Sequence, residues 1–126
     1  MTRRIISTEH APGAIGPYSQ AIRAGNTVYL SGQVALDPAT GELVSGDFEQ
    51  EARRVFENLK AVAQAAEATL DDAVRVTIYL VDMAQFPVVN AVMAQYFREP
   101  YPARVTIGVA ALPRGARVEV DCVLVT

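Results

Sequence analysis

Two segments of the chain carry small and apolar side chains at helical spacing. Between residues 48 and 69 such positions recur every three or four residues, and charged or amide side chains fill most of the others. Asp47 precedes this run and can accept hydrogen bonds from the free N–H groups of a first helical turn. A second pattern covers residues 84–96, with Pro87 in its first turn, where proline is tolerated. The sequence therefore predicts two helices, the second ending before Pro100.

Alternating apolar and polar positions predict six strands in the remaining segments. Their expected ranges are 3–7, 20–24, 27–32, 73–81, 103–109 and 116–125. Gly25-Asn26 predicts a tight turn between the second and third strands, and the turn-rich stretch before Ala116 favours a hairpin of the last two. The predicted order is β-β-β-α-β-α-β-β, an α+β fold with both helices on one face of a mixed sheet.

The two faces of this expected sheet differ in polarity. The face expected beneath the helices carries Val28, Leu30, Val74, Val76, Ile78, Val118, Val120 and Leu124. The opposite face is expected to carry Tyr29, Tyr79, Val81, Val123 and Val125 beside Arg75, Arg104, Arg117, Glu119 and Asp121. This mixture is too apolar for a fully solvated face, so we expect another copy of the chain to cover it in a closed symmetric oligomer. A sheet with a few surface tyrosines and valines is the alternative.

Length and composition narrow the class of protein. The 126 residues suit a single domain over 1–126, and 51% hydrophobic with 20% charged residues exclude a disordered chain. No apolar run approaches the roughly 20 residues of a membrane helix, and the start lacks a secretory pattern, so we expect a cytoplasmic protein with no membrane partner. Eleven basic against fourteen acidic residues disfavour nucleic-acid binding. One cysteine and one histidine cannot form a thiolate and imidazole zinc site, and no metal or cofactor is expected.

Arg104 and Glu119 are the main candidates for chemistry. Arg104 follows Pro102 at the start of a strand, where a guanidinium can grip a carboxylate through two parallel hydrogen bonds. In the expected hairpin, Glu119 lies on the same face of the adjacent strand, a few ångströms away. An ordinary cross-strand ion pair is the alternative, and alternation does not decide between the two. His10 is expected in a solvated loop, and Cys122 as a small buried hydrophobic residue.

Six short motifs run through the chain in order. They are Gly16-Pro17-Tyr18-Ser19-Gln20-Ala21, Ser31-Gly32-Gln33, residues 76–82, Val89-Asn90, Pro102-Ala103-Arg104 and Val118-Glu119-Val120. Together they resemble the Rid/YjgF family of enamine/imine deaminases over essentially the whole chain. The resemblance implies a chorismate-mutase-like protomer, a homotrimer with three clefts between subunits, and an enzyme that hydrolyses 2-imino acids to 2-oxo acids and ammonia, a 2-iminobutyrate/2-iminopropanoate deaminase. Such imines arise when pyridoxal-phosphate enzymes release unstable enamines.

The resemblance also implies roles for single residues. Arg104 matches the arginine that binds the substrate carboxylate, and Glu119 matches the acid that handles the water. Tyr18, Ser31 and Asn90 match further residues that line the cleft.

The chain departs from the family pattern directly after Arg104. The best-characterised deaminase branch has Pro-Ala-Arg-Ser-Cys, whereas this chain has Val105 and Thr106 in the last two positions. Alternation places Thr106 on the side of Arg104, where its hydroxyl can still hold a water molecule in the substrate site. Two other functions stay open: a module that binds a 2-oxo acid or amino acid in the same cleft, chaperone-like and without turnover, and a ribonuclease. The acidic charge and lone histidine give little means for the latter.

Overall fold

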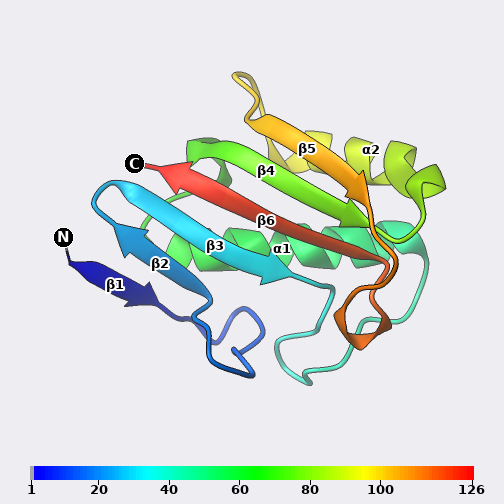
Figure 1. Ribbon diagram of the computed structural model, residues 1–126, viewed down its shortest axis with the longest axis horizontal. Coiled ribbons are helices and arrows are strands. Elements are labelled where there is room, and N and C mark those ends of the chain that lie inside the picture. The colour runs from blue at the N-terminus through cyan, green and yellow to red at the C-terminus, as the bar shows by residue number, and fades with distance from the viewer. Residues whose placement is uncertain (1) are drawn as a thin grey trace.

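Residues 2–126 of the computed structural model form a six-stranded sheet with two α-helices on one face (Figure 1). In chain order the elements are β1 (Arg3–Ile6), β2 (Ala21–Ala24), β3 (Thr27–Gln33), α1 (Phe48–Ala65), β4 (Ala73–Leu80), α2 (Phe86–Tyr96), β5 (Ala103–Gly108) and β6 (Val118–Val125). Short 3-10 turns precede β4, α2 and β6: η1 (Leu70–Asp72), η2 (Met83–Gln85) and η3 (Pro113–Gly115). The order of elements and the α+β fold predicted from the pattern are confirmed.

Helix α1 supplies most of the core that covers the sheet. Asp47 caps it as expected, because its Oδ1 accepts a hydrogen bond of 3.0 Å from the Gln50 N–H. Its buried face includes Val55, Phe56 and Leu59, none of which has any exposed surface. The helix ends at Ala65, four residues before the predicted end, since Glu67 adopts a left-handed φ of 59° that a continuing helix does not allow.

The order of the strands differs from the expected hairpin at the end of the chain. The sheet runs β1-β2-β3-β6-β4-β5, so β6 lies between β3 and β4, and β5 pairs with β4 in parallel. The reason is the α2 crossover, which carries the chain from the end of β4 back to its start and so produces a parallel neighbour. The hairpin of the last two strands was therefore a wrong prediction, and β5 becomes an edge strand.

The face beneath the helices is the predicted one with a single exchange. Seven of the eight side chains expected there are buried, but Val74 is 47% exposed and Ala73 is buried in its place. The register of β4 against β6 shifts between Ala73 and Arg75, and this bulge turns Val74 outward.

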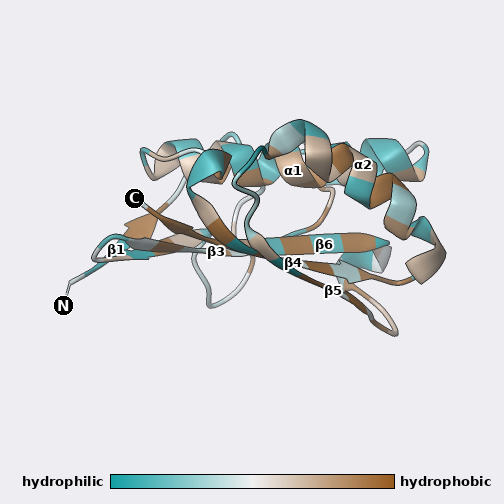
Figure 2. Cartoon of the chain, turned by 90° about the horizontal axis from the view of Figure 1, so that it is seen from above, coloured by the Kyte–Doolittle hydropathy of each residue, from teal (hydrophilic) through white to brown (hydrophobic). Residues whose placement is uncertain are grey.

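The opposite face of the sheet is left bare by both helices (Figure 2). It carries exposed apolar side chains on several strands, among them Ile5, Tyr29, Val105 and Ile107. Arg104 and Arg117 were wrongly expected here. Both guanidinium groups lie on the helix side, above the rings of Phe86 and Phe48 respectively. None of the helices within residues 2–126 has the length and apolar character that crossing a membrane requires.

Candidate active site

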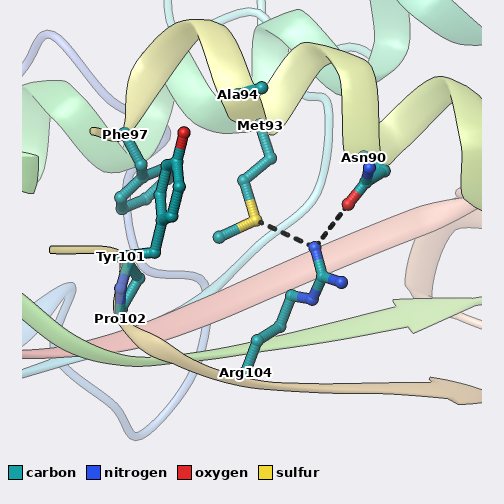
Figure 3. A pocket seen from close by; sticks show the side chains of 7 residues that line it. All are labelled: Asn90, Met93, Ala94, Phe97, Tyr101, Pro102 and Arg104. Atoms are coloured by element: carbon teal, nitrogen blue, oxygen red, sulfur yellow. Dashed lines mark hydrogen bonds between the residues drawn. The ribbon is translucent and has the colours of Figure 1, made fainter. Parts of the chain in front are cut away.

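Arg104 is the second residue of β5 and points toward helix α2. It pairs in register with Val76 of β4, whose side chain is fully buried, so both side chains leave the helix-facing side of the sheet. The Arg104 Nη1 donates a hydrogen bond of 2.6 Å to Asn90 Oδ1 and a longer one of 3.7 Å to the Met93 sulfur (Figure 3). Its guanidinium carbon lies 5.2 Å from the centre of the Phe86 ring. Helix α2 therefore orients the guanidinium through three of its side chains.

These contacts leave one edge of the Arg104 guanidinium open. Among residues 2–126, the hydrogen bonds of Arg104 use Nη1 alone, so the Nε and Nη2 donors have no protein partner. Two parallel donors on a planar edge match the two oxygens of a carboxylate. The side chain is exposed, which gives a ligand access to this edge.

Thr106 lies on the same side of β5 as Arg104, as alternation predicted. It pairs with Ile78, which is also fully buried beneath the helices. The Thr106 Oγ1 is buried and has no hydrogen-bond partner within residues 2–126. A buried hydroxyl without a partner carries a free-energy cost, and a water or ligand atom bound there would remove it.

Glu119 is the second residue of β6 and lies on the open face. It pairs in register with Tyr79 of β4, and its carboxylate reaches over Gly32 of β3. The register between β3 and β6 shifts around Gly32, and a Cβ at this position would overlap the Glu119 carboxylate. Any side chain at position 32 would therefore require the Glu119 carboxylate to move.

The environment of Glu119 shifts the pKa of its carboxyl upward. Partial burial raises the pKa of this carboxyl above its usual value, and the nearby charge of Asp121 raises it further. Asp121 is held in place by the Tyr79 hydroxyl, which donates a hydrogen bond of 2.8 Å to its Oδ2. A carboxyl with a raised pKa can accept and return a proton closer to neutral pH than an exposed one.

Tyr18 and Ser31 line the same groove as Glu119. The groove has a volume of about 520 Å³ and also contains Ile15 and Arg114. Gln20 orders the loop before it, since its amide nitrogen donates to the carbonyl oxygens of residues 8, 11 and 12.

Within this groove the local hydrogen bonds fix the two predicted side chains. The Ser31 hydroxyl donates a hydrogen bond of 2.6 Å to the Ser19 carbonyl oxygen. The Tyr18 hydroxyl accepts one of 3.4 Å from the Ile15 N–H.

The structure thus divides the six predicted site residues into two half-sites. One consists of Asn90, Arg104 and Thr106 on the helix side, and the other of Tyr18, Ser31 and Glu119 on the open side. Arg104 and Glu119 are two strands apart, about 10 Å across the sheet and roughly 10 Å along it, and they leave opposite faces. Their expected proximity within one chain, and with it the cross-strand ion pair, was wrong because β6 does not neighbour β5.

Sequence reasoning missed some side chains that line these half-sites. Arg114 lies in the η3 turn with a left-handed φ of 63°, and Met93 contacts Arg104 from α2. Neither position carries a local signal beyond turn or core spacing. His10 lines neither cavity, and Cys122 is buried in the core, where burial raises the pKa of its thiol to about 12.

Comparisons with known proteins find similar chains over nearly the full length. The family model described as endoribonuclease L-PSP matches residues 8–126. A protein named 2-iminobutanoate/2-iminopropanoate deaminase from Dermatophagoides farinae is 50% identical over 123 residues, covering 98% of this chain and 96% of its own. The human protein of the same name is 44% identical over 125 residues, covering 99% and 91%. The crystal structure of RidA from an Antarctic Psychrobacter matches with a TM-score of 0.94 at 47% identity, covering 98% and 99%.

Proposed function

Since this chain belongs to the endoribonuclease L-PSP family, also called the Rid/YjgF family, we propose that it hydrolyses 2-imino acids to 2-oxo acids and ammonia. The observation that carries the proposal is the Arg104 guanidinium, which is fixed by Asn90 and Phe86 and keeps two parallel donors free. A substrate with a carboxylate next to its reacting carbon is the ligand that such an edge positions best. The name of the two relatives described above, at 50% and 44% identity, agrees with this chemistry.

We propose that the complete site forms between copies of the chain in a homotrimer. A 2-imino acid is too small to contact Arg104 and Glu119 of one chain, because they lie on opposite faces of the sheet. A second copy that covers the open face would bring its own Glu119, Tyr18 and Ser31 to the neighbour's Arg104. The exposed apolar side chains of this face, such as Tyr29 and Ile107, give the association a hydrophobic contribution.

The proposed chemistry needs no group beyond these side chains and water. Arg104 binds the substrate carboxylate through Nε and Nη2, and the Glu119 carboxylate of the neighbouring copy orients a water against C2. The water oxygen forms a bond to C2 while the C=N electron pair moves to nitrogen, and Glu119 takes one proton of the water and passes it to that nitrogen, which gives a neutral carbinolamine. Glu119 then takes the hydroxyl proton of the carbinolamine and delivers it to the nitrogen as the C=O bond forms and the C–N bond breaks, so that ammonia leaves and a 2-oxo acid remains.

The raised pKa of Glu119 suits both halves of this reaction. A carboxylate that binds a proton more readily than usual is a better base toward water, and its conjugate acid is still strong enough to protonate nitrogen. Because imines already hydrolyse in water, positioning and modest proton transfer are sufficient, each worth about 2–6 kcal/mol of the barrier. The unpartnered Thr106 hydroxyl offers a further hydrogen bond to the water or to the substrate nitrogen.

A coupled assay tests this function directly. Imines are generated in place from single amino acids by an amino-acid oxidase, and the release of 2-oxo acid and ammonia is followed with and without the protein. We expect the protein to accelerate both releases in equal amounts. Binding of 2-oxo acids without any acceleration would replace the deaminase by a binding module that uses the same cleft.

A further inference from the structure

Arg114 lines the groove that contains Glu119, and no step of the proposed reaction uses it. It lies in the η3 turn, the dark orange segment that leads into β6 in Figure 1. The side chain is exposed, and its Nη2 donates a hydrogen bond of 3.2 Å to the Gly41 carbonyl oxygen. Among residues 2–126 this is its only hydrogen bond, so the Nε and Nη1 donors have no protein partner.

The backbone of Arg114 adopts a conformation that disfavours an arginine. Its φ of 63° lies in the left-handed region, where a residue with a Cβ is less stable than glycine. Within residues 2–126 one other non-glycine residue has a positive φ, Glu67, and there the conformation ends helix α1. The η3 turn ends no such helix, and its last residue, Gly115, has a left-handed φ of 72° as well. Glycine at position 114 would suit this turn better, which points to a role for the arginine side chain.

The ligand proposed for this groove carries the charge that Arg114 attracts. A 2-imino acid with an unprotonated nitrogen has one negative charge, and so does the 2-oxo acid formed from it. The chain has a net charge of −3 and the groove holds the Glu119 carboxyl, so both oppose the entry of an anion. Within residues 2–126, Arg114 is the one cationic side chain that lines the groove. Its field therefore acts on the substrate before the Arg104 of the neighbouring copy binds the carboxylate.

We propose that Arg114 is a substrate-binding residue of the shared site, whose positive charge draws the anionic 2-imino acid into the Glu119 groove and stabilises the bound anion. The inference rests on the proposed deaminase function and adds a second cationic group to the site, beside Arg104. Since Arg114 is exposed, its effect is modest, about three- to fivefold in KM at low salt, and salt screens it. Because the charge acts on bound substrate and transition state alike, kcat stays nearly unchanged.

Three substitutions at position 114 separate the charge from the backbone conformation. Arg114→Lys keeps the charge, Arg114→Gln removes it, and Arg114→Gly removes it and also relieves the left-handed φ. Arg98→Gln is the matched control, because it lowers the net charge by the same amount at an exposed arginine whose partner, Asp71, lies outside both half-sites. KM and kcat are measured on 2-iminopropanoate formed in place, at about 0.01 M and about 1 M salt, where the Debye length is roughly 30 Å and 3 Å.

At low salt we expect KM to rise about three- to fivefold in Arg114→Gln and Arg114→Gly and to change less than about twofold in Arg114→Lys and Arg98→Gln. At high salt the difference between Arg114→Gln and the unmodified protein should shrink below about twofold. An unchanged KM in Arg114→Gln, an equal rise in Arg114→Lys, or a rise that persists at high salt would overturn the proposal. Arg114→Gly should melt a few degrees above Arg114→Gln, and a lower melting temperature would overturn the strain on which the proposal rests.

The dissociation constant of 2-oxobutanoate, measured by calorimetry, gives a second readout that needs no turnover. If no imine is hydrolysed but this anion binds about three- to fivefold more weakly to Arg114→Gln and not to Arg114→Lys, the deaminase proposal fails and the role of Arg114 in anion binding stands. Unchanged binding to Arg114→Gln at low salt overturns that role, whatever the activity.

Discussion

Replacing Arg104 with lysine keeps a positive charge at the start of β5 but removes the planar edge that carries Nε and Nη2. It also removes the hydrogen bond of 2.6 Å to Asn90 and the contact with the Phe86 ring, which together aim the guanidinium. An ammonium group offers a single charged donor without a fixed direction. We therefore expect Arg104→Lys to resemble Arg104→Ala far more than the unmodified protein.

The magnitude follows from the number of hydrogen bonds lost. One charge-assisted hydrogen bond contributes about 2 kcal/mol, so losing one of two lowers kcat/KM about thirtyfold. Arg104→Ala loses both and should cost about 2–4 kcal/mol, or thirty- to a thousandfold in kcat/KM. The effect on folding should be small, because the side chain is exposed and its surface contacts contribute less than about 1 kcal/mol.

The assay measures kcat/KM on an imine formed in place, together with the melting temperature of each variant. Arg98→Lys is a matched control, since Arg98 is an exposed arginine that bonds to Asp71 outside both half-sites. We expect this control to keep the activity of the unmodified protein. A fully active Arg104→Ala, or an Arg104→Lys as active as the unmodified protein, would refute the role of the two-point contact.

Three further predictions concern Glu119 and the assembly. Glu119→Gln should lower turnover about a hundredfold or more. The melting temperature of Glu119→Gln at pH 7 should not fall below that of the unmodified protein. Because the folded-state pKa of Glu119 is raised, its carboxyl stabilises the fold fully only below the unfolded-state pKa, and this contribution is lost as pH rises through the folded-state pKa. A clear drop in melting temperature at pH 7 would contradict the environment described for Glu119. Asp121→Asn removes a like charge, so the acid limb of the pH–rate profile should move to lower pH, and an unmoved limb would exclude this coupling. Light scattering should give about three times 13.6 kDa, and a monomer at micromolar concentration would oppose the shared site.

Much of the fold could be predicted from the sequence because its signals are local. The spacing in α1, the Asp47 cap and the alternation in β4 and β6 depend on neighbours a few residues away. The order of the strands does not depend on such near neighbours, since the position of β6 in the sheet depends on where the α2 crossover returns the chain. The bulge that turns Val74 outward is likewise a property of two paired strands, and alternation within one strand cannot reveal it.

The candidate site could be predicted in its residues but not in its arrangement. Alternation correctly placed Arg104 and Thr106 on one side of β5, but which side depends on the register with Val76 in β4. The assumed hairpin therefore moved Arg104 to the wrong face and brought Glu119 too close. The close approach of the Glu119 carboxylate to Gly32 has no signature in the sequence, because the two residues are distant along the chain.

The most direct test of the shared site mixes two nearly inactive proteins. Arg104→Ala and Glu119→Gln each lose one half-site, so each alone should retain at most about 3% of the activity of the unmodified protein. Refolded together in equal amounts, they form mixed trimers in which an intact Arg104 of one copy meets an intact Glu119 of its neighbour at about a quarter of the interfaces. We predict that the mixture recovers about a quarter of the activity of the unmodified protein, whereas a mixture no more active than its two components would show that both residues do not act in one site formed between copies.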